Sequence, residues 1–290
     1  MKIDAKVQSI SKLKDYFFLV PDYQREYVWK PDDEVEQFLI DIENEYSPDA
    51  KEQRNYFLGS IIIVNNDRCF DVVDGQQRLT TIMLSLCVFR DLLKKETLNS
   101  AQKNYLQIIE NLLYNFDIES GETRVRLELQ YEESHDYLTA LIQEQPYNGV
   151  RSPSIVRMQD AYTKILRHFQ LYAGIDELID FAKYCLTKIE LVVIESQDLS
   201  SALKIFETIN QRGAGLNAMD LVKNLLFKAT KLLDSKFYIG VNTALNRFKN
   251  DFQYNFTGWN KSSVEARQKI LLELVFDTWR INDLRLDRVK

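Results

Sequence analysis

The stretch CFDVVDGQQRLTTIMLSL, Cys69–Leu86, joins an apolar run to a helical pattern through a short polar segment. The run CFDVVD has the β-branched and apolar composition of a buried strand, and it ends at Asp74. From Leu79 onward, apolar residues recur at helical spacing. A strand and a helix are therefore predicted to meet at DGQQR, Asp74–Arg78, which we call the seam.

The residue types of the seam suit a nucleotide. A helix N-terminus presents unpaired backbone N–H groups that favour an anion. Glycine permits a tight turn and a close approach to the backbone, an arginine can bind phosphate oxygens in pairs, and an aspartate can hold Mg²⁺ or a ribose hydroxyl. The glutamines can orient a water or contact a base edge. The catalytic candidates are Asp74, Gln76, Gln77 and Arg78, with Asp74 also the metal ligand, and the nucleotide-binding candidates are Gly75, Thr80 and Thr81.

The residues of the seam also fit a simpler interpretation. A capped strand-to-helix turn with a surface pair between Arg78 and Asp74 would need the same amino acids, and chemistry alone does not choose between the two. The GxxxxGK[ST] phosphate cradle is absent from the sequence, so a nucleotide site here must be of another kind.

A second polar segment is VPDYQREYVWK, Val20–Lys30. Aromatic and polar residues alternate in it, and aromatic rings and guanidinium groups stack on bases. This pattern favours a functional role for Tyr23, Gln24 and Arg25, although Arg25 could instead pair with Glu26 or Asp22 in a packed loop. Packing into the core is the favoured interpretation for Tyr27 and Trp29.

A third polar segment lies at the bend in FETINQRGAGLNAMDLVKNLLF, Phe206–Phe227. Asn, Gln and Arg gather where one predicted helix ends and another begins, and Asn217 can cap the second helix. Asn210 and Arg212 are further nucleotide-binding candidates. An ordinary, well-capped helix connection is the alternative.

Composition limits the function classes. The net charge is −6, so the surface as a whole cannot act as a general polyanion binder, although a local basic groove is compatible with it. Neither the 3 cysteines nor the 2 histidines occur in a metal-binding pattern, and we expect the cysteines to be buried, reduced thiols. The sequence shows no signal peptide and no membrane span, which predicts a cytoplasmic protein.

The hydrophobic pattern predicts an α+β fold, a small sheet within a mainly helical domain. Helices are predicted from Pro31, from Leu79 and across most of the chain beyond 100. Strands are predicted at Phe17–Val20, Tyr56–Val64, Cys69–Asp74, Thr123–Glu133 and Lys188–Ser196, with the second and third forming a hairpin.

Taken together, PDYQREYVW, FLGSIII, VVDGQQRLTT and FETINQRGAGLNAMDLVKN resemble, in order, the N-terminal domain of the GmrSD modification-dependent restriction endonucleases. The resemblance spans about residues 5–230. It implies a ParB/sulfiredoxin-like core, without sulfiredoxin chemistry because no cysteine lies in or beside the seam. It also implies binding and hydrolysis of a nucleoside triphosphate (GTP, ATP or CTP) with Mg²⁺, coupled to restriction of modified phage DNA. Tyr23, Gln24 and Arg25 match a second polar signature of the family, which the resemblance connects with sensing of DNA or its modification, or with the same cleft as the nucleotide.

This family resemblance also sets expectations for domains and partners. We expect a nucleotide-binding domain at 1–230 and a helical extension at 231–290. Many family members carry a C-terminal HNH nuclease domain that is not seen here, so we expect that this half was removed or that a partner supplies it. Modified DNA is the expected partner, no membrane is expected, and a homodimer is one option for the oligomeric state.

Three functions are in competition. The first is a nucleotide-hydrolysing sensor domain of a restriction system. The second is a non-catalytic, ParB-like DNA-binding or nucleotide-gated adaptor, which the lack of an obvious general base favours. The third is a helical scaffold whose polar segments are only caps, and the coincidence of three such segments argues against it.

Overall fold

The computed structural model describes residues 3–210, apart from 23, 49, 51, 119–120, 135 and 173. The chain up to Thr208 forms one compact unit. The predicted domain boundary at 230 and the predicted extension at 231–290 lie outside the described residues and stay predictions.

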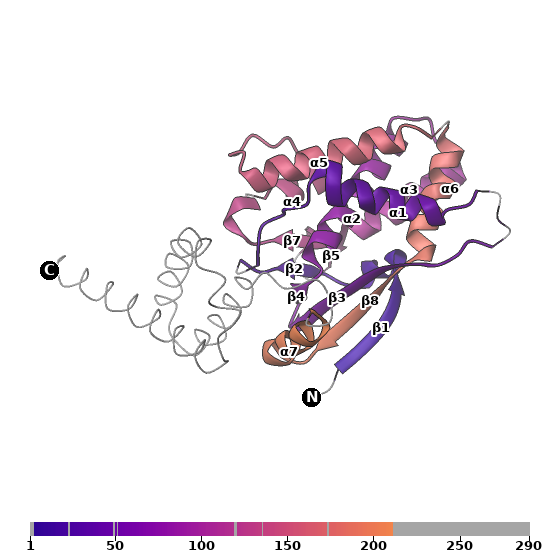
Figure 1. The fold of residues 1–290 in the computed structure, drawn as a ribbon. Helices are drawn as coiled ribbons and strands as arrows, with labels where there is room; N and C mark the ends of the chain where they lie inside the picture. Colours follow the sequence, from indigo (N-terminus) through magenta and orange to yellow (C-terminus); the bar gives the residue numbers. More distant parts are fainter. Residues whose placement is uncertain are drawn as a thin grey trace, which may run out of the picture. The chain divides into compact units, whose positions relative to one another are not determined.

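A mixed six-stranded sheet organises the unit (Figure 1). Its central strand β3 pairs in parallel with β8 and antiparallel with β4, so the predicted hairpin is confirmed. On the far side of β4, strand β2 runs parallel to both β4 and β7. In spatial order the strands are β1 (Ile3–Ser9), β8 (Ile189–Ser196), β3 (Tyr56–Asn66), β4 (Cys69–Asp74), β2 (Phe18–Val20) and β7 (Leu127–Leu129).

Helices cover the sheet, which confirms the predicted α+β class. Most of the labelled helices gather on one side of the sheet in Figure 1, and α7 (Leu199–Asn210) lies on the other side. Those on the first side are α1 (Glu36–Glu45), α2 (Gln76–Lys94), α3 (Ser100–Leu113), α4 (Tyr137–Ile142), α5 (Pro153–Phe169) and α6 (Ile175–Lys188). Short helices at Ile10–Asp15 (η1), Pro31–Val35 (η2) and Glu132–Ser134 (η3) complete the set.

Helix α2 lies at the centre of the core, as its apolar pattern predicted. It contacts α3, α5 and α6, and most of its side chains are buried on all sides. Near its C-terminal end the ring of Phe89 stacks on that of Phe169, with ring centroids 4.3 Å apart. Because α2 follows β4 directly, this packing fixes the position of the seam.

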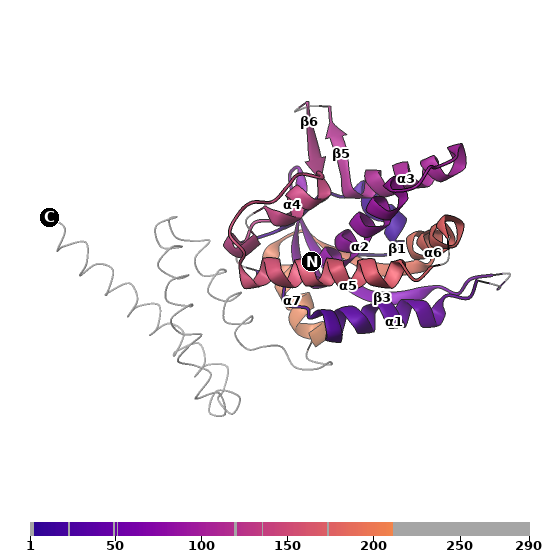
Figure 2. The same cartoon turned by 90° about the horizontal axis from the view of Figure 1, so that it is seen from above.

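Several elements differ from the predictions. Helix α2 begins at Gln76 rather than Leu79, so the glutamines and the arginine of the seam form its first turn. The predicted strand Thr123–Glu133 is two strands, since β6 (Glu122–Val125) pairs with β5 (Tyr114–Asp117) in a projecting hairpin whereas β7 joins the main sheet (Figure 2). The chain changes partner at Arg126, whose N–H donates to Leu113 while its carbonyl accepts from Phe18. Strand β1 was not predicted. The predicted helix over 101–116 ends at Leu113, because the chain from Tyr114 pairs with β6 as strand β5.

The three cysteines are free thiols, and Cys87 and Cys185 are buried as expected, while Cys69 is half-buried. Within the described part of the chain, no helix has the length and apolar character needed to cross a bilayer.

Candidate functional site

Gly75 connects β4 to α2 and must be a glycine for two reasons. Its φ of 89° lies in the left-handed region. A Cβ at this position would lie 2.5 Å from Cγ2 of Ile61 and 3.1 Å from the Ser60 carbonyl oxygen. As a glycine it makes no side-chain capping hydrogen bond to the first turn of α2, while its own N–H donates to the Asp74 carboxylate.

Arg78 extends from that first turn along β3. Its Nη1 donates to the Ser60 carbonyl at 3.1 Å, and its Nε lies 3.0 Å from where a Cβ of Gly59 would be. Gly59 has a φ of 129° and follows a bulge in the pairing of β3 with β8. Sequence analysis did not assign a role to Gly59, but an isolated glycine within a β-branched strand is a signal of close approach. The absence of a side chain at Gly59 thus leaves room for this arginine.

Asp74 ends β4, near the positively charged side chains of Arg78 and Arg25. Burial raises the pKa of its carboxyl, and Arg78, the Gly75 N–H and Arg25 offset only part of that shift. Arg78 donates to the Ser60 carbonyl and acts on Asp74 through its charge, which differs from the surface ion pair of the simpler interpretation. When the carboxyl is ionised, the nearby positive charges therefore do not fully compensate the cost of burying it.

Gln77 holds the loop after β2. Its Nε2 donates to the Glu26 carbonyl at 3.0 Å, and its Oε1 accepts from the Val28 N–H at 2.9 Å. One amide therefore satisfies two backbone groups that lie about 50 residues earlier in the chain. With both polar atoms engaged, this side chain serves to position the loop in the present conformation.

Gln76 makes only half of the equivalent contacts. Its Nε2 donates to the Arg25 carbonyl at 3.0 Å, while its Oε1 is buried and has no hydrogen-bond partner in the described part of the chain. The residue is only 7% exposed. A buried acceptor without a donor lowers the stability of the fold by on the order of 1–3 kcal/mol. A donor from water or a ligand at Oε1 of Gln76 would therefore be stabilising.

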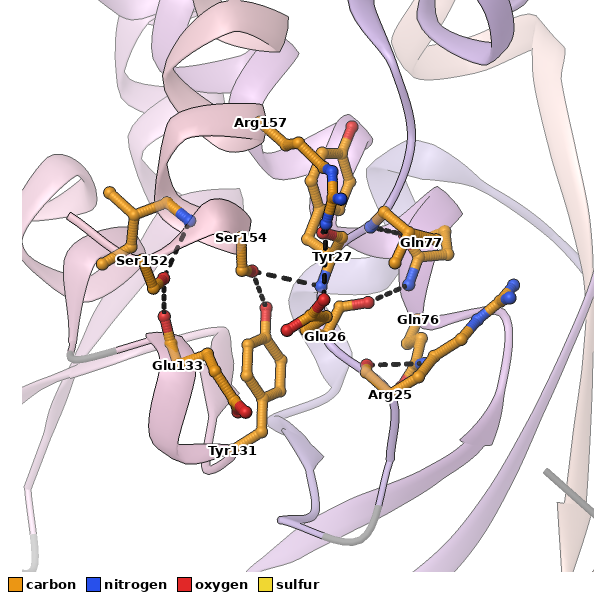
Figure 3. A network of polar contacts seen from close by, with 12 residues as sticks. Arg25, Glu26, Tyr27, Gln76, Gln77, Tyr131, Glu133, Ser152, Ser154 and Arg157 are labelled. Atoms are coloured by element: carbon orange, nitrogen blue, oxygen red, sulfur yellow. Dashed lines mark hydrogen bonds and ion pairs between the residues drawn. The ribbon is translucent and has the colours of Figure 1, made fainter. Parts of the chain in front are cut away.

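The loop is also anchored from a second helix (Figure 3). The Tyr27 N–H donates to Oγ of Ser154 in the first turn of α5, at 3.2 Å. Arg157 donates to the Glu26 carboxylate at 3.3 Å, and Gln24 donates from its Nε2 to the Val73 carbonyl at 3.0 Å. The backbone from Gln24 to Val28 is thus fixed between β4, α2 and α5.

The side chains of this loop differ in their burial. Tyr27 is 1% exposed and shares a 2.9 Å hydrogen bond with Thr81, and Trp29 packs beside Phe38. Arg25 is exposed, and in Figure 3 its side chain extends away from Glu26 and Arg157. Tyr23 lies outside the described residues, so the structure describes only Gln24 and Arg25 of the three predicted sensing residues.

The predicted threonines lie deeper than a surface site requires. Thr80 is 2% exposed and Thr81 is fully buried. The Thr81 hydroxyl also donates to the Gln77 carbonyl at 2.9 Å, within α2. This geometry favours a packing role over the predicted contact with a nucleotide for Thr81.

The third polar segment cannot be placed against the seam. Asn210 ends α7, its side chain is not among the described ones, and Arg212 lies outside the described residues. The structure therefore brings together Asp74, Gly75, Gln76, Gln77 and Arg78 with Gln24 and Arg25.

No group of three His, Cys, Asp or Glu side chains within the described ranges is arranged to hold a metal ion. The seam offers one carboxylate, that of Asp74. Mg²⁺ is commonly held by one or two carboxylates together with waters and substrate phosphates, so the single carboxylate fits Mg²⁺ that arrives with a nucleotide.

These features define an α+β domain in which a strand that ends in an aspartate passes through a left-handed glycine into a central helix whose first turn carries two glutamines and an arginine. A model of the family "GmrSD restriction endonuclease, N-terminal domain" matches residues 7–227. Since this is more than half of the 290 residues, the chain belongs to that family. A search of curated proteins found no match.

Proposed function

We propose that this chain is the nucleoside-triphosphate-binding and -hydrolysing sensor domain of a cytoplasmic system that restricts modified phage DNA. Family membership supports the restriction role and implies DNA as substrate and a nuclease domain as partner. The HNH-type nuclease would belong to another domain or subunit.

The arrangement at the start of α2 carries the nucleotide part of this proposal. Backbone N–H groups without a side-chain cap and the Arg78 guanidinium would hold phosphate oxygens, while Asp74 would hold Mg²⁺. The metal would compensate the buried carboxylate, whose pKa is raised. Without it, Asp74 and the free Oε1 of Gln76 would repel phosphate oxygens, so binding should require Mg²⁺.

The test is turnover of GTP, ATP and CTP with Mg²⁺ in the wild type, Asp74→Ala and Arg78→Ala, alongside calorimetric binding. Arg54→Ala, at an exposed position before β3, is the matched control for loss of one positive charge. We expect the seam variants to lose turnover by at least about 100-fold, the scale of removing one electrostatic contact to a transition state. Turnover that survives both substitutions would remove the proposal.

A non-catalytic, nucleotide-gated DNA-binding adaptor is the second candidate. The engagement of both polar atoms of Gln77 favours it, because that side chain is not free to orient an attacking water. This candidate predicts nucleotide binding without turnover. Gel shifts with modified and unmodified duplexes, with and without nucleotide, would show gating, and failure of every duplex to bind would exclude the adaptor.

A further inference from the structure

The two edges of the six-stranded sheet are different. Strand β7 ends the sheet on one side and has only 3 residues, which is a common way to protect an edge from pairing with other chains. Strand β1 ends it on the other side with 7 residues and no proline. Among the described residues no strand pairs with the outer edge of β1 (Figure 1).

Strand β1 is also regular and open. It pairs with β8 from Ile3 to Ser9 without a register shift, so no bulge turns its outer backbone groups away. The side chains of Asp4 and Lys6 are 51% and 56% exposed, and Val7 is 61% exposed. An extended row of free backbone donors and acceptors is a template for adding a strand.

The charges on β1 identify the strand that fits this template. Asp4 and Lys6 lie on the same face of the strand, on either side of Ala5, and form an ion pair at 2.6 Å. If a second β1 aligns antiparallel with a two-fold axis at Ala5, each Asp4 lies opposite the partner subunit's Lys6. The same alignment places each Lys6 opposite the partner subunit's Asp4, so the edge is complementary to itself.

We propose that β1 pairs antiparallel with β1 of a second copy of this chain, about a two-fold axis at Ala5. The contact is isologous and joins two six-stranded sheets into one. A lysine on an edge strand usually opposes such pairing, but the neighbouring aspartate converts it into a recognition element. The contact is short, so we expect a weak, salt-sensitive dimer.

The test is a concentration series of the full chain by sedimentation equilibrium, with circular dichroism as a check on folding. Lys6→Asp places two acids opposite two acids, and Asp4→Lys places two lysines opposite two lysines. We expect each to weaken dimerisation by about tenfold or more, as two attractive cross-strand pairs become repulsive. The double variant, Asp4→Lys with Lys6→Asp, restores complementarity and should restore the dimer.

Lys14→Asp, at an exposed position in η1, is the control for a change of net charge. A wild type that stays monomeric throughout the series would overturn the proposal. A dimer that both single variants leave unchanged would also overturn it, because association would then use another surface.

Discussion

At the scale of single residues, Gly75 fixes the geometry of the seam. The residue has a left-handed backbone and no room for a Cβ beside Ile61. We expect Gly75→Ala to lower the free energy of unfolding by about 2–4 kcal/mol, as backbone strain and overpacking add together. Urea denaturation measures the loss.

Gly121→Ala is the matched control for this glycine. Its φ of 73° is also left-handed, but a Cβ there would contact nothing within 4 Å. We expect a loss of about 1 kcal/mol from backbone strain alone. Equal losses in the two variants would show that the contact with Ile61 has no energetic weight.

Asp74 should make stability depend on pH. Because burial raises the pKa of its carboxyl, the folded protein retains this proton to a higher pH than the unfolded chain does. The free-energy cost of holding the ionised Asp74 carboxylate in the folded protein is absent below the ordinary pKa. It develops as pH rises and is fully present above the raised pKa. Each pKa unit corresponds to about 1.4 kcal/mol.

We therefore expect Asp74→Asn to gain thermal stability relative to the wild type as pH rises from about 4 to about 7. Thermal melts across that range measure the difference in Tm. A difference that does not change with pH would mean that the burial of this carboxylate is compensated. The variant should also lose Mg²⁺-dependent nucleotide binding, in contrast to its gain in stability.

At the scale of elements, Gln77 joins α2 to the loop after β2. Gln77→Ala would leave the Glu26 carbonyl and the Val28 N–H without their partner. We expect a destabilisation of about 1–3 kcal/mol and faster tryptic cleavage after the exposed Arg25. Limited proteolysis followed by mass spectrometry measures the cleavage rate.

Gln107→Ala is the control, because this exposed glutamine donates to Asn111 within α3 and has no bond to the loop after β2 among the described residues. It should leave cleavage after Arg25 unchanged. If Gln77→Ala also leaves cleavage unchanged, the contacts from Ser154 and Arg157 are enough to hold the loop.

Local pattern predicted most elements, and long-range contacts explain the rest. Alternating or continuous apolar residues gave β3, β4, β8 and α2 within a few residues. The pattern could not show that the chain changes partner at Arg126, because that change depends on contacts with Leu113 and Phe18. The exposed β1 lacks a buried face to produce a clear period, so it was missed.

The candidate site shows the same division. The sequence identified Asp74–Arg78 as a chemically unusual segment, since the residue types alone carry that information. It could not show that Gln77 bonds to backbone groups of Glu26 and Val28, because any residue can supply a backbone group. The role of Gly59 likewise depends on an arginine that lies 19 positions later.

At the scale of the whole molecule, the unit that runs to Thr208 contains its own core. We expect a fragment ending at Asn210 to fold and to unfold cooperatively. Calorimetry checks this, and a broad, non-cooperative transition would contradict it. If Arg212 contributes to nucleotide binding, the fragment will bind more weakly than the full chain, and Arg212→Ala in the full chain will show the same loss.

The contact between Gly59 and Arg78 has a consequence for other members of the family. A side chain at the first position would occupy the space through which the guanidinium runs. The two residues should therefore be inherited together, and homologues that replace the glycine should also have lost the arginine. Homologues that have lost both residues would lack the arginine that we propose binds phosphate, and a comparison of sequences can identify them before any protein is purified.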